Sequence, residues 1–361
     1  MALGLPVATG LLCLFLAILA ADIMGLFSGK THFEVDGRTV VITGGSQGMG
    51  RGLAKLLAQK GANIVIVARN QAKLDSALQY ISPAAQNRSK QRFHAISADL
   101  TSPEENIRVV AEVTAWNHGS PPDIVWANAG SSVPTLFIDT PLSTLKSQMD
   151  TNYFAAMYLA HATLRSWLKP QAPSDSSKTS ATNSKPRHFI ITSSSVAFVG
   201  VAGYAPYAPA KAALRSLADT LCSELNLYNG YRRAHPDTGP QADVKIHCIT
   251  PGTITSPGHE QEQEVKHEVT KQLEESDPAQ TEDEVAAAAV KGLESGGYLI
   301  TTQLLGHAMR AGMLGGSPRN NWFVDTVLSW VVAIAWLFIG PDMEGKVYKY
   351  GKTQEVNLPS S

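Results

Sequence analysis

The chain has 361 residues, of which 44% are hydrophobic and 17% charged, and its formal net charge is −1. This balance lacks the basic excess that nucleic-acid binding requires. The three cysteines, Cys13, Cys222 and Cys248, are far apart, which argues against a disulfide framework and favours a reducing compartment.

The first segment, residues 1–29, is a predicted membrane anchor. Asp22 is the only charged side chain between residues 2 and 27, and about 20 apolar residues are enough for one membrane span. A cleaved signal peptide is the alternative, but no Lys or Arg precedes the run and no clear cleavage site follows it. Because Lys30 and Arg38 follow the run, the positive-inside bias predicts that the rest of the chain faces the cytosol.

Short apolar segments alternate with helical segments from residue 38 onward. Residues 39–42 form the first predicted strand and residues 50–59 the first predicted helix. Further strands are expected at residues 63–67, 93–97, 123–127, 189–192 and 244–249. Apolar strands separated by helices are typical of a parallel sheet that is covered on both faces. The sequence therefore predicts an α/β fold with a doubly wound, Rossmann-like parallel sheet.

A glycine-rich loop, T-G-G-S-Q-G-M-G, occupies residues 43–50 between the first predicted strand and helix. Gly44 permits a tight turn, Gly48 lets the backbone approach a pyrophosphate, and Gly50 permits close helix packing. The N-terminus of the helix then presents free N–H groups to the anion. We expect the following residues of this loop to bind a dinucleotide: Gly44, Ser46, Gln47, Gly48 and Gly50.

The end of the second predicted strand indicates which dinucleotide binds. An NAD site usually places a carboxylate there for the ribose hydroxyls, whereas this chain has Arg69, followed by Lys73 one helical turn later. Two cations suit a 2′-phosphate, so the predicted cofactor is NADPH. The alternative is an ordinary solvated Arg–Lys pair, and the missing acid is the more decisive observation.

Further motifs follow in chain order. Asp99-Leu100 follows the third predicted strand, Asn-Ala-Gly occupies residues 128–130, Tyr207 and Lys211 form a Y-x-x-x-K motif, and Pro-Gly occupies residues 251–252. With the glycine loop, these motifs over residues 38–256 resemble the short-chain dehydrogenase/reductase family. The resemblance implies that Asp99 and Leu100 hold the adenine, that Asn128 and Gly130 support the sheet and cofactor, and that Thr253 lies in the nicotinamide loop.

The same resemblance implies a catalytic set of Asn152, Ser194, Tyr207 and Lys211. Ser194 lies thirteen residues before Tyr207, which is the usual family spacing, and Ser193 is the fallback because residues 193–195 are all serine. Ser194 would hold the substrate oxygen, Lys211 would bind the nicotinamide ribose, and Asn152 would hold a water in a proton relay. Pro209-Ala210 stands where the family often has Ala-Ser, but proline is tolerated in a first helical turn.

The spacing of Tyr207 and Lys211 also supports this chemistry. Reduction of a ketone builds negative charge on its oxygen, which a donor must stabilise. Residues at i and i+4 share a helix face, and a nearby ammonium should lower the pKa of a tyrosine. Tyr207 would then act as a general acid near neutral pH. Alone, this spacing would indicate a surface pair on an amphipathic helix.

The regions outside the signature resemble fungal members of the family that reduce long-chain keto sphingoid bases with NADPH. That resemblance implies an enzyme of sphingolipid biosynthesis on the endoplasmic reticulum membrane, facing the cytosol. An alkyl tail favours the bilayer by about 0.8 kcal/mol per methylene, so a tethered enzyme is reasonable. Neither a metal nor nucleic acid is expected, and the sequence is compatible with a homo-oligomer.

The domain organisation follows from these segments. After the anchor, residues 30–256 are the predicted NADPH-binding catalytic domain, and residues 257–320 complete it. Within the latter, residues 258–294 are expected to close over the substrate tail as a lid, with a solvated helical pair as the alternative. Residues 170–186 are rich in Ser, Thr, Pro and Lys and are predicted to be a flexible surface loop.

A second apolar stretch covers residues 321–340 and precedes a polar tail at residues 341–361. It contains Asp325, and a full crossing would place Lys346, Lys349 and Lys352 in the lumen, against the positive-inside bias. We therefore expect a re-entrant or interfacial membrane segment. A second full span and a buried core helix are the alternatives.

Two other functions remain open from the sequence alone. The first is another membrane-anchored reductase of the family, acting on a steroid, a retinoid or a long-chain acyl ketone. The second is a non-catalytic scaffold that binds NADPH, although the joint presence of Asn152, Ser194, Tyr207 and Lys211 argues against it.

Overall fold

The computed structural model describes residues 31–170, 184–275 and 277–353. The predicted anchor at residues 1–29 lies outside these ranges, as does most of the predicted loop at residues 170–186. The polar tail is described as far as residue 353.

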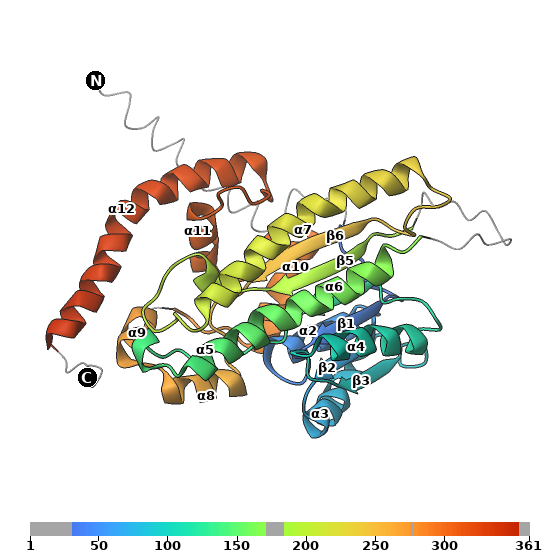
Figure 1. Ribbon diagram of the computed structural model, residues 1–361, viewed down its shortest axis with the longest axis horizontal. Helices are drawn as coiled ribbons and strands as arrows, with labels where there is room; N and C mark the ends of the chain where they lie inside the picture. Colours follow the sequence, from blue (N-terminus) through green and yellow to red (C-terminus); the bar gives the residue numbers. More distant parts are fainter. Residues whose placement is uncertain (1–30, 171–183, 276, 354–361) are drawn as a thin grey trace.

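A seven-stranded parallel sheet forms the centre of the structure, in the order β3-β2-β1-β4-β5-β6-β7 (Figure 1). Its strands are β1 (Thr39–Thr43), β2 (Asn63–Ala68), β3 (Phe93–Ser97), β4 (Ile124–Ala127), β5 (Arg187–Thr192), β6 (Val244–Thr250) and β7 (Leu299–Thr301). The chain turns outward in both directions from β1 and β4, which confirms the predicted doubly wound α/β fold. β7 was not among the predicted strands because it is only 3 residues long.

Helices cover both faces of the sheet. One face carries α2 (Gly48–Gln59), α3 (Gln71–Ile81) and α10 (Glu282–Glu294), and the other carries α4 (Pro103–Trp116), α6 (Ala155–Trp167) and α7 (Ala208–Ala234). Successive strand residues point to opposite faces, so Val41 packs in the core beneath α4 and α6 while Ile42 packs in the core beneath α2 and α10. The apolar strands are therefore buried on both sides.

The segment that was predicted to be a lid divides into two parts. α8 (Pro257–Val265) and α9 (Glu268–Glu274) contain residues that line a cavity at the sheet edge. α10 is instead a core helix, because Val285, Ala289 and Leu293 are fully or almost fully buried against the sheet. The lid prediction for residues 258–294 is therefore wrong for α10.

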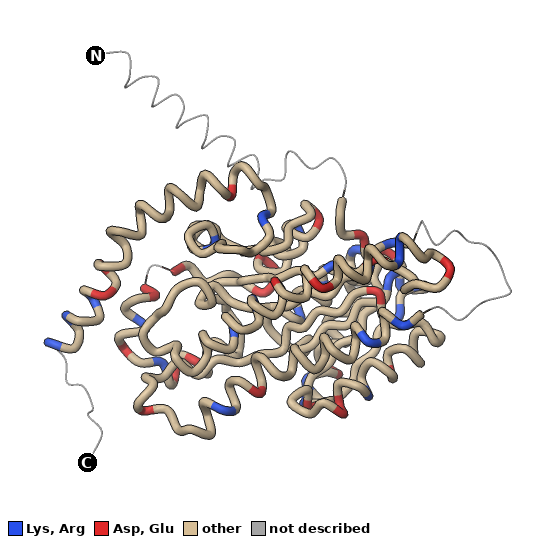
Figure 2. The backbone as a smooth tube through the Cα atoms, turned by 45° about the horizontal axis from the view of Figure 1, so that its top comes forward, with Lys and Arg blue, Asp and Glu red and all other residues tan. Residues whose placement is uncertain are grey.

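The second apolar stretch lies in one continuous helix, α12 (Trp322–Thr353), which extends beyond the predicted segment and includes the first part of the predicted tail. The sequence has no charged residue between Asp325 and Asp342, and Figure 2 shows most of this helix without charged positions. Within the described ranges it is the one helix long and apolar enough to cross a membrane. Its apolar side chains, such as Trp330 and Leu337, are exposed, so the alternative of a buried core helix is wrong.

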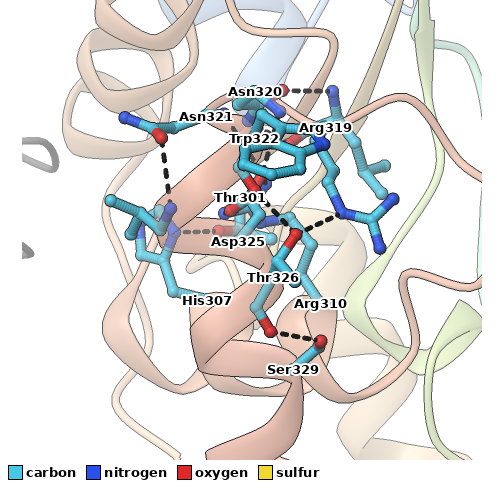
Figure 3. A network of polar contacts seen from close by, with 12 residues as sticks. Thr301, His307, Arg310, Arg319, Asn320, Asn321, Trp322, Asp325, Thr326 and Ser329 are labelled. Carbon is cyan, nitrogen blue, oxygen red and sulfur yellow. Dashed lines mark hydrogen bonds and ion pairs between the residues drawn. The ribbon is translucent and has the colours of Figure 1, made fainter.

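A buried ion pair fastens the beginning of α12 to the preceding helix α11 (Leu304–Gly312) (Figure 3). Arg310 donates to both carboxylate oxygens of Asp325, at 2.6 and 3.2 Å, and Asp325 is 1% exposed. The backbone N–H of Asn320 donates to the same carboxylate at 2.8 Å. The acid that interrupts the apolar stretch therefore serves as an attachment point to the catalytic domain.

Candidate active site

A cavity of about 770 Å³ opens where the parallel strands end. Loops after β1, β2, β3, β4, β5 and β6 contribute to its wall, as expected for a doubly wound sheet. The predicted site residues that line it are Gly44, Ser46, Gln47, Gly48, Arg69, Lys73, Asp99, Leu100, Asn128, Gly130, Ser193, Ser194, Tyr207, Lys211 and Thr253. Gly50 and Asn152 do not line the cavity but lie against two residues that do, Gly44 and Gly130.

The glycine loop is shaped by close backbone approaches. Gly44 and Gly48 adopt φ values of +65° and +54°, which favour glycine. A Cβ at Gly50 would lie 2.2 Å from the carbonyl oxygen of Gly44, so any side chain there would displace the loop. Thr43 connects the loop to the Asn-Ala-Gly turn, because its hydroxyl accepts hydrogen bonds from the backbone N–H groups of Asn128 and Ala129 at 2.9 and 3.0 Å.

One end of the cavity is basic. Arg69 is exposed at the end of β2, and within the described residues its guanidinium has no hydrogen-bond or ion-pair partner. The ammonium group of Lys73 lies 3.4 Å from Oε1 of Gln47 in the glycine loop. Asp99, after β3, accepts hydrogen bonds from the backbone and hydroxyl of Thr101. Two cations, Arg69 and Lys73, therefore line this end of the cavity together with the carboxylate of Asp99.

The other end of the cavity brings Ser194, Tyr207 and Lys211 together. Ser194 precedes the short helix η5 (Ser195–Ala197), and Tyr207 caps α7, which accommodates Pro209 in its first turn as predicted. The Lys211 ammonium group donates to the carbonyl oxygen of Thr192 at 3.0 Å and lies 5.4 Å from the centre of the Tyr207 ring. Three groups that can donate protons or hydrogen bonds thus converge on one region.

Ser193 is placed differently from Ser194. Its side chain is almost fully buried, and its hydroxyl donates to the carbonyl oxygen of Lys211 at 2.7 Å. Ser194 is only half-buried and its hydroxyl lies at the cavity beside Tyr207. The structure therefore gives Ser193 a contact that holds α7 against β5, and leaves Ser194 free to face a substrate.

Asn152 is fully buried in a π-helical turn, η3 (Asp150–Phe154), between α5 (Leu142–Met149) and α6. Its amide accepts from the N–H of Ser131 at 3.1 Å and donates to the carbonyl oxygens of Ser131 and Gln148, both at 2.9 Å. π-Helical turns are frequent at functional sites. Here the turn holds the loop that carries Gly130 next to Lys211.

The prediction that the Lys211 ammonium lowers the pKa of Tyr207 is wrong for the structure described. Burial raises the pKa of Tyr207 above its ordinary value and the charge on Glu262 adds to the rise, while the Ser194 hydroxyl opposes it. Burial also lowers the pKa of Lys211, to about 8. Removal from water is the largest cause of both shifts in pKa. Tyr207 therefore stays protonated at neutral pH, as a proton donor must.

This end of the cavity is also lined by three residues that were not predicted from the sequence: Tyr204, Glu262 and Glu274. The tyrosine lies three residues before Tyr207, and their ring centres are 6.1 Å apart. The two acids come from α8 and α9, where the sequence showed only an acidic helical stretch. The spacing of the two tyrosines was a usable signal, whereas nothing local indicated which acids would reach the cavity.

Comparison with known proteins defines the class. The family described as short chain dehydrogenase matches residues 38–267. The chain therefore belongs to the short-chain dehydrogenase/reductase family, and it is an oxidoreductase that uses a nicotinamide cofactor.

Two similar proteins indicate a narrower group within this family. The chain is 50% identical to the 3-ketodihydrosphingosine reductase of Aspergillus fumigatus, over 99% of this chain and 96% of that protein. It is 43% identical to the 3-ketodihydrosphingosine reductase of Neurospora crassa, over 91% of this chain and 86% of that protein. The similarity thus extends beyond the family signature to both ends of the chain.

Solved structures agree on the fold. A short-chain type dehydrogenase/reductase from Mycobacterium ulcerans is 22% identical, with a TM-score of 0.58 over 74% of this chain and 89% of that chain. A short-chain dehydrogenase/reductase from Burkholderia phymatum in complex with NAD is 17% identical, with a TM-score of 0.59 over 75% and 90%. At these identities the likeness supports the architecture alone.

Proposed function

We propose that this chain reduces 3-ketodihydrosphingosine to dihydrosphingosine with NADPH, a step of sphingolipid biosynthesis. The observation that carries the reaction is the convergence of Ser194, Tyr207 and Lys211 at one end of a cavity whose other end has the glycine loop and Arg69. The nearly full-length identity to reductases named for this ketone supports the substrate. The direct test is reduction of that ketone by the purified protein.

The residues of the cavity fit NADPH. The glycine loop leaves backbone space that a Cβ would fill, and Gly44, Ser46, Gln47 and Gly48 would hold the pyrophosphate. Asp99 and Leu100 would hold the adenine, Asn128, Gly130 and Thr253 would support the rest of the cofactor, and Lys211 would hold the nicotinamide ribose. Arg69 and Lys73, with no acid beside them at the end of β2, favour the 2′-phosphate.

The side chains at the other end of the cavity have separate roles in the reduction of the ketone. When bound, NADPH would supply a hydride to the ketone carbon. The Ser194 hydroxyl donates a hydrogen bond to the ketone oxygen, and Tyr207 transfers its proton to that oxygen as the alcohol forms. The charge on Lys211 stabilises the resulting phenolate, which regains a proton from solvent. The family resemblance gives Asn152 a water in a proton relay, but its side-chain amide bonds Ser131 and Gln148, so we assign it the role of a positioning residue.

The three serines give a test of these roles. Ser194→Ala should lower turnover by about 100-fold, the scale for losing an oxyanion donor, because the ketone oxygen loses that hydrogen bond. Ser195→Ala should have little effect on turnover. Ser193→Ala should mainly lower the thermal unfolding temperature, with a smaller loss of turnover, because the Ser193 hydroxyl donates to the backbone of α7. Turnover and thermal unfolding of the three variants measure both effects. If Ser193→Ala has the lowest turnover, Ser193 holds the oxygen.

The cofactor preference depends on Arg69. Arg69→Asp should weaken NADPH binding far more than NADH binding, because a carboxylate would face the 2′-phosphate. A change of about 10- to 100-fold in the ratio of kcat/KM for the two cofactors is expected for a charge-assisted contact. Arg88→Asp, on an exposed loop whose residues do not line the cavity, is the matched control. Equal kinetics of the unmutated enzyme with both cofactors would contradict the assignment.

We further propose that the enzyme is held on the endoplasmic reticulum with its catalytic domain in the cytosol. α12 supports membrane association, because exposed apolar side chains lie on all of its sides rather than on one face. The N-terminal anchor remains a prediction from the sequence. The division into residues 30–256 and 257–320 is descriptive only, because α10 and β7 complete the same sheet-centred domain.

The sequon Asn87-Arg88-Ser89 reports the orientation. Asn87 is exposed in the loop before β3, so glycosyltransferases would reach it if the domain were lumenal. We expect the protein to stay with membranes in alkaline carbonate and to show no mobility shift on glycosidase treatment. A glycan at Asn87 would overturn the cytosolic orientation and revive the cleaved signal peptide.

A further inference from the structure

A buried polar cluster lies on the cavity wall beside Tyr207 and consists of Tyr204, Glu262, Lys266 and Glu274. The Tyr204 hydroxyl donates to Oε1 of Glu262 at 2.9 Å. The Lys266 ammonium lies 3.1 Å from the same oxygen and 2.6 Å from Oε2 of Glu274. The side chain of Lys266 is only 1% exposed, so the cluster is withdrawn from bulk water.

The charges of this cluster do not balance. Two carboxylates share one ammonium group, and among the described residues no other cation lies within 4.0 Å of either carboxylate. One net negative charge therefore remains in a largely buried setting, where an uncompensated charge is costly. A cationic ligand at the cavity would offset that cost.

Glu262 also has an unused oxygen. Oε1 accepts from Tyr204 and contacts Lys266, whereas Oε2 accepts no hydrogen bond from the described part of the chain. The Glu262 side chain keeps 15% of its surface exposed and lines the cavity, as does Glu274. An acceptor is therefore available to a molecule inside the cavity.

The cluster is close to the reacting groups. The ring centres of Tyr204 and Tyr207 are 6.1 Å apart, and the charge on Glu262 raises the pKa of Tyr207. A ketone oxygen held by Ser194 and Tyr207 would therefore place the atoms next to the carbonyl carbon near Glu262.

We propose that Glu262, with Glu274 behind it, binds the ammonium group of an amino ketone substrate and sets the preference for a 2-amino ketone over a plain ketone. This inference rests on the proposed function, because 3-ketodihydrosphingosine has its amine on the carbon beside the ketone. The ammonium would donate to the free oxygen of Glu262, a charge-assisted hydrogen bond strengthened by the low local dielectric. Lys266 keeps the two carboxylates in place while leaving their excess charge for the substrate.

The test compares two substrates of the full-length enzyme in detergent with NADPH: 3-ketodihydrosphingosine and the same hydroxy ketone with hydrogen in place of the amine. The unmutated enzyme should prefer the amine-bearing ketone. Glu262→Gln keeps an acceptor for Tyr204 but removes the charge, so this preference in kcat/KM should fall on the order of 10- to 100-fold. Reduction of the amine-free ketone should change little, which a merely structural role of Glu262 would not produce.

Control variants keep the test interpretable. Glu268→Gln on α9 breaks only an exposed ion pair with Lys271 and should leave the substrate preference unchanged. Glu274→Gln removes the excess charge while keeping Glu262, so it should lower the preference by a smaller factor, and it replaces Glu262→Gln if that variant does not fold.

Three outcomes would overturn the proposal. An equal loss on both ketones would make Glu262 structural, and an unchanged preference would remove it from recognition. An unmutated enzyme that reduces both ketones equally well would contradict the ammonium site while leaving the ketone reductase in place. An enzyme that reduces neither ketone would overturn the proposed function as well.

Discussion

Tyr207→Phe should lower turnover by at least the roughly 100-fold that loss of a general acid typically causes, while NADPH still binds. The substitution keeps the ring at the start of α7 and removes only the hydroxyl that faces Ser194. Because burial raises the pKa of this hydroxyl, Tyr207 keeps its proton at neutral pH and can donate it to the ketone oxygen. Steady-state rates measure the loss, and cofactor fluorescence reports binding.

The matched control is Tyr228→Phe, an exposed tyrosine on the same helix. It should keep full turnover, because it lies far along α7 from the cavity lining. Near-full turnover of Tyr207→Phe itself would show that another group donates the proton, and would leave the Y-x-x-x-K motif without its proposed role.

Asp325→Asn should destabilise the protein by about 3–5 kcal/mol, the scale for removing one partner of a buried ion pair. Arg310 is 6% exposed and would keep its charge without the carboxylate that it contacts through two hydrogen bonds. The free energy of unfolding in detergent measures the loss. Protease sensitivity between α11 and α12 would show whether the helix has detached.

Asp342→Asn serves as the control on the same helix. Asp342 pairs with Lys346 across one exposed helical turn, and exposed pairs of this kind contribute at most about 1 kcal/mol. If Asp325→Asn and Asp342→Asn lower the free energy of unfolding equally, the buried ion pair in Figure 3 does not stabilise the attachment of α12.

Most of the fold could be predicted from local sequence patterns. The central strands β1, β2 and β4 are apolar runs, because the middle of a parallel sheet is buried on both faces, and the helices between them follow the expected alternation. β7 escaped prediction because its 3 residues show no periodicity. α10 was mistaken for part of a lid because its sequence begins with acids, which here occupy its first turn, while its apolar residues face the sheet.

The residues of the candidate site could likewise be predicted from the sequence only in part. The glycine loop and the residues around Tyr207 could be located because their spacing along the chain reflects the backbone geometry that they adopt. The pairing of Asp325 with Arg310 and the approach of Glu262 to Tyr204 could not be predicted, since each joins elements that only the tertiary fold brings together. The direction of the Tyr207 pKa was also missed, because burial is not a property of local sequence.

The most direct measurement is oxidation of NADPH by the purified full-length protein in detergent, with 3-ketodihydrosphingosine as the ketone and the Tyr207→Phe variant beside it. We expect stoichiometric formation of dihydrosphingosine, faster with NADPH than with NADH, and strongly reduced in the variant. Absence of product under conditions in which the folded protein binds NADPH would contradict it, as would equal rates for the variant and the unmutated enzyme.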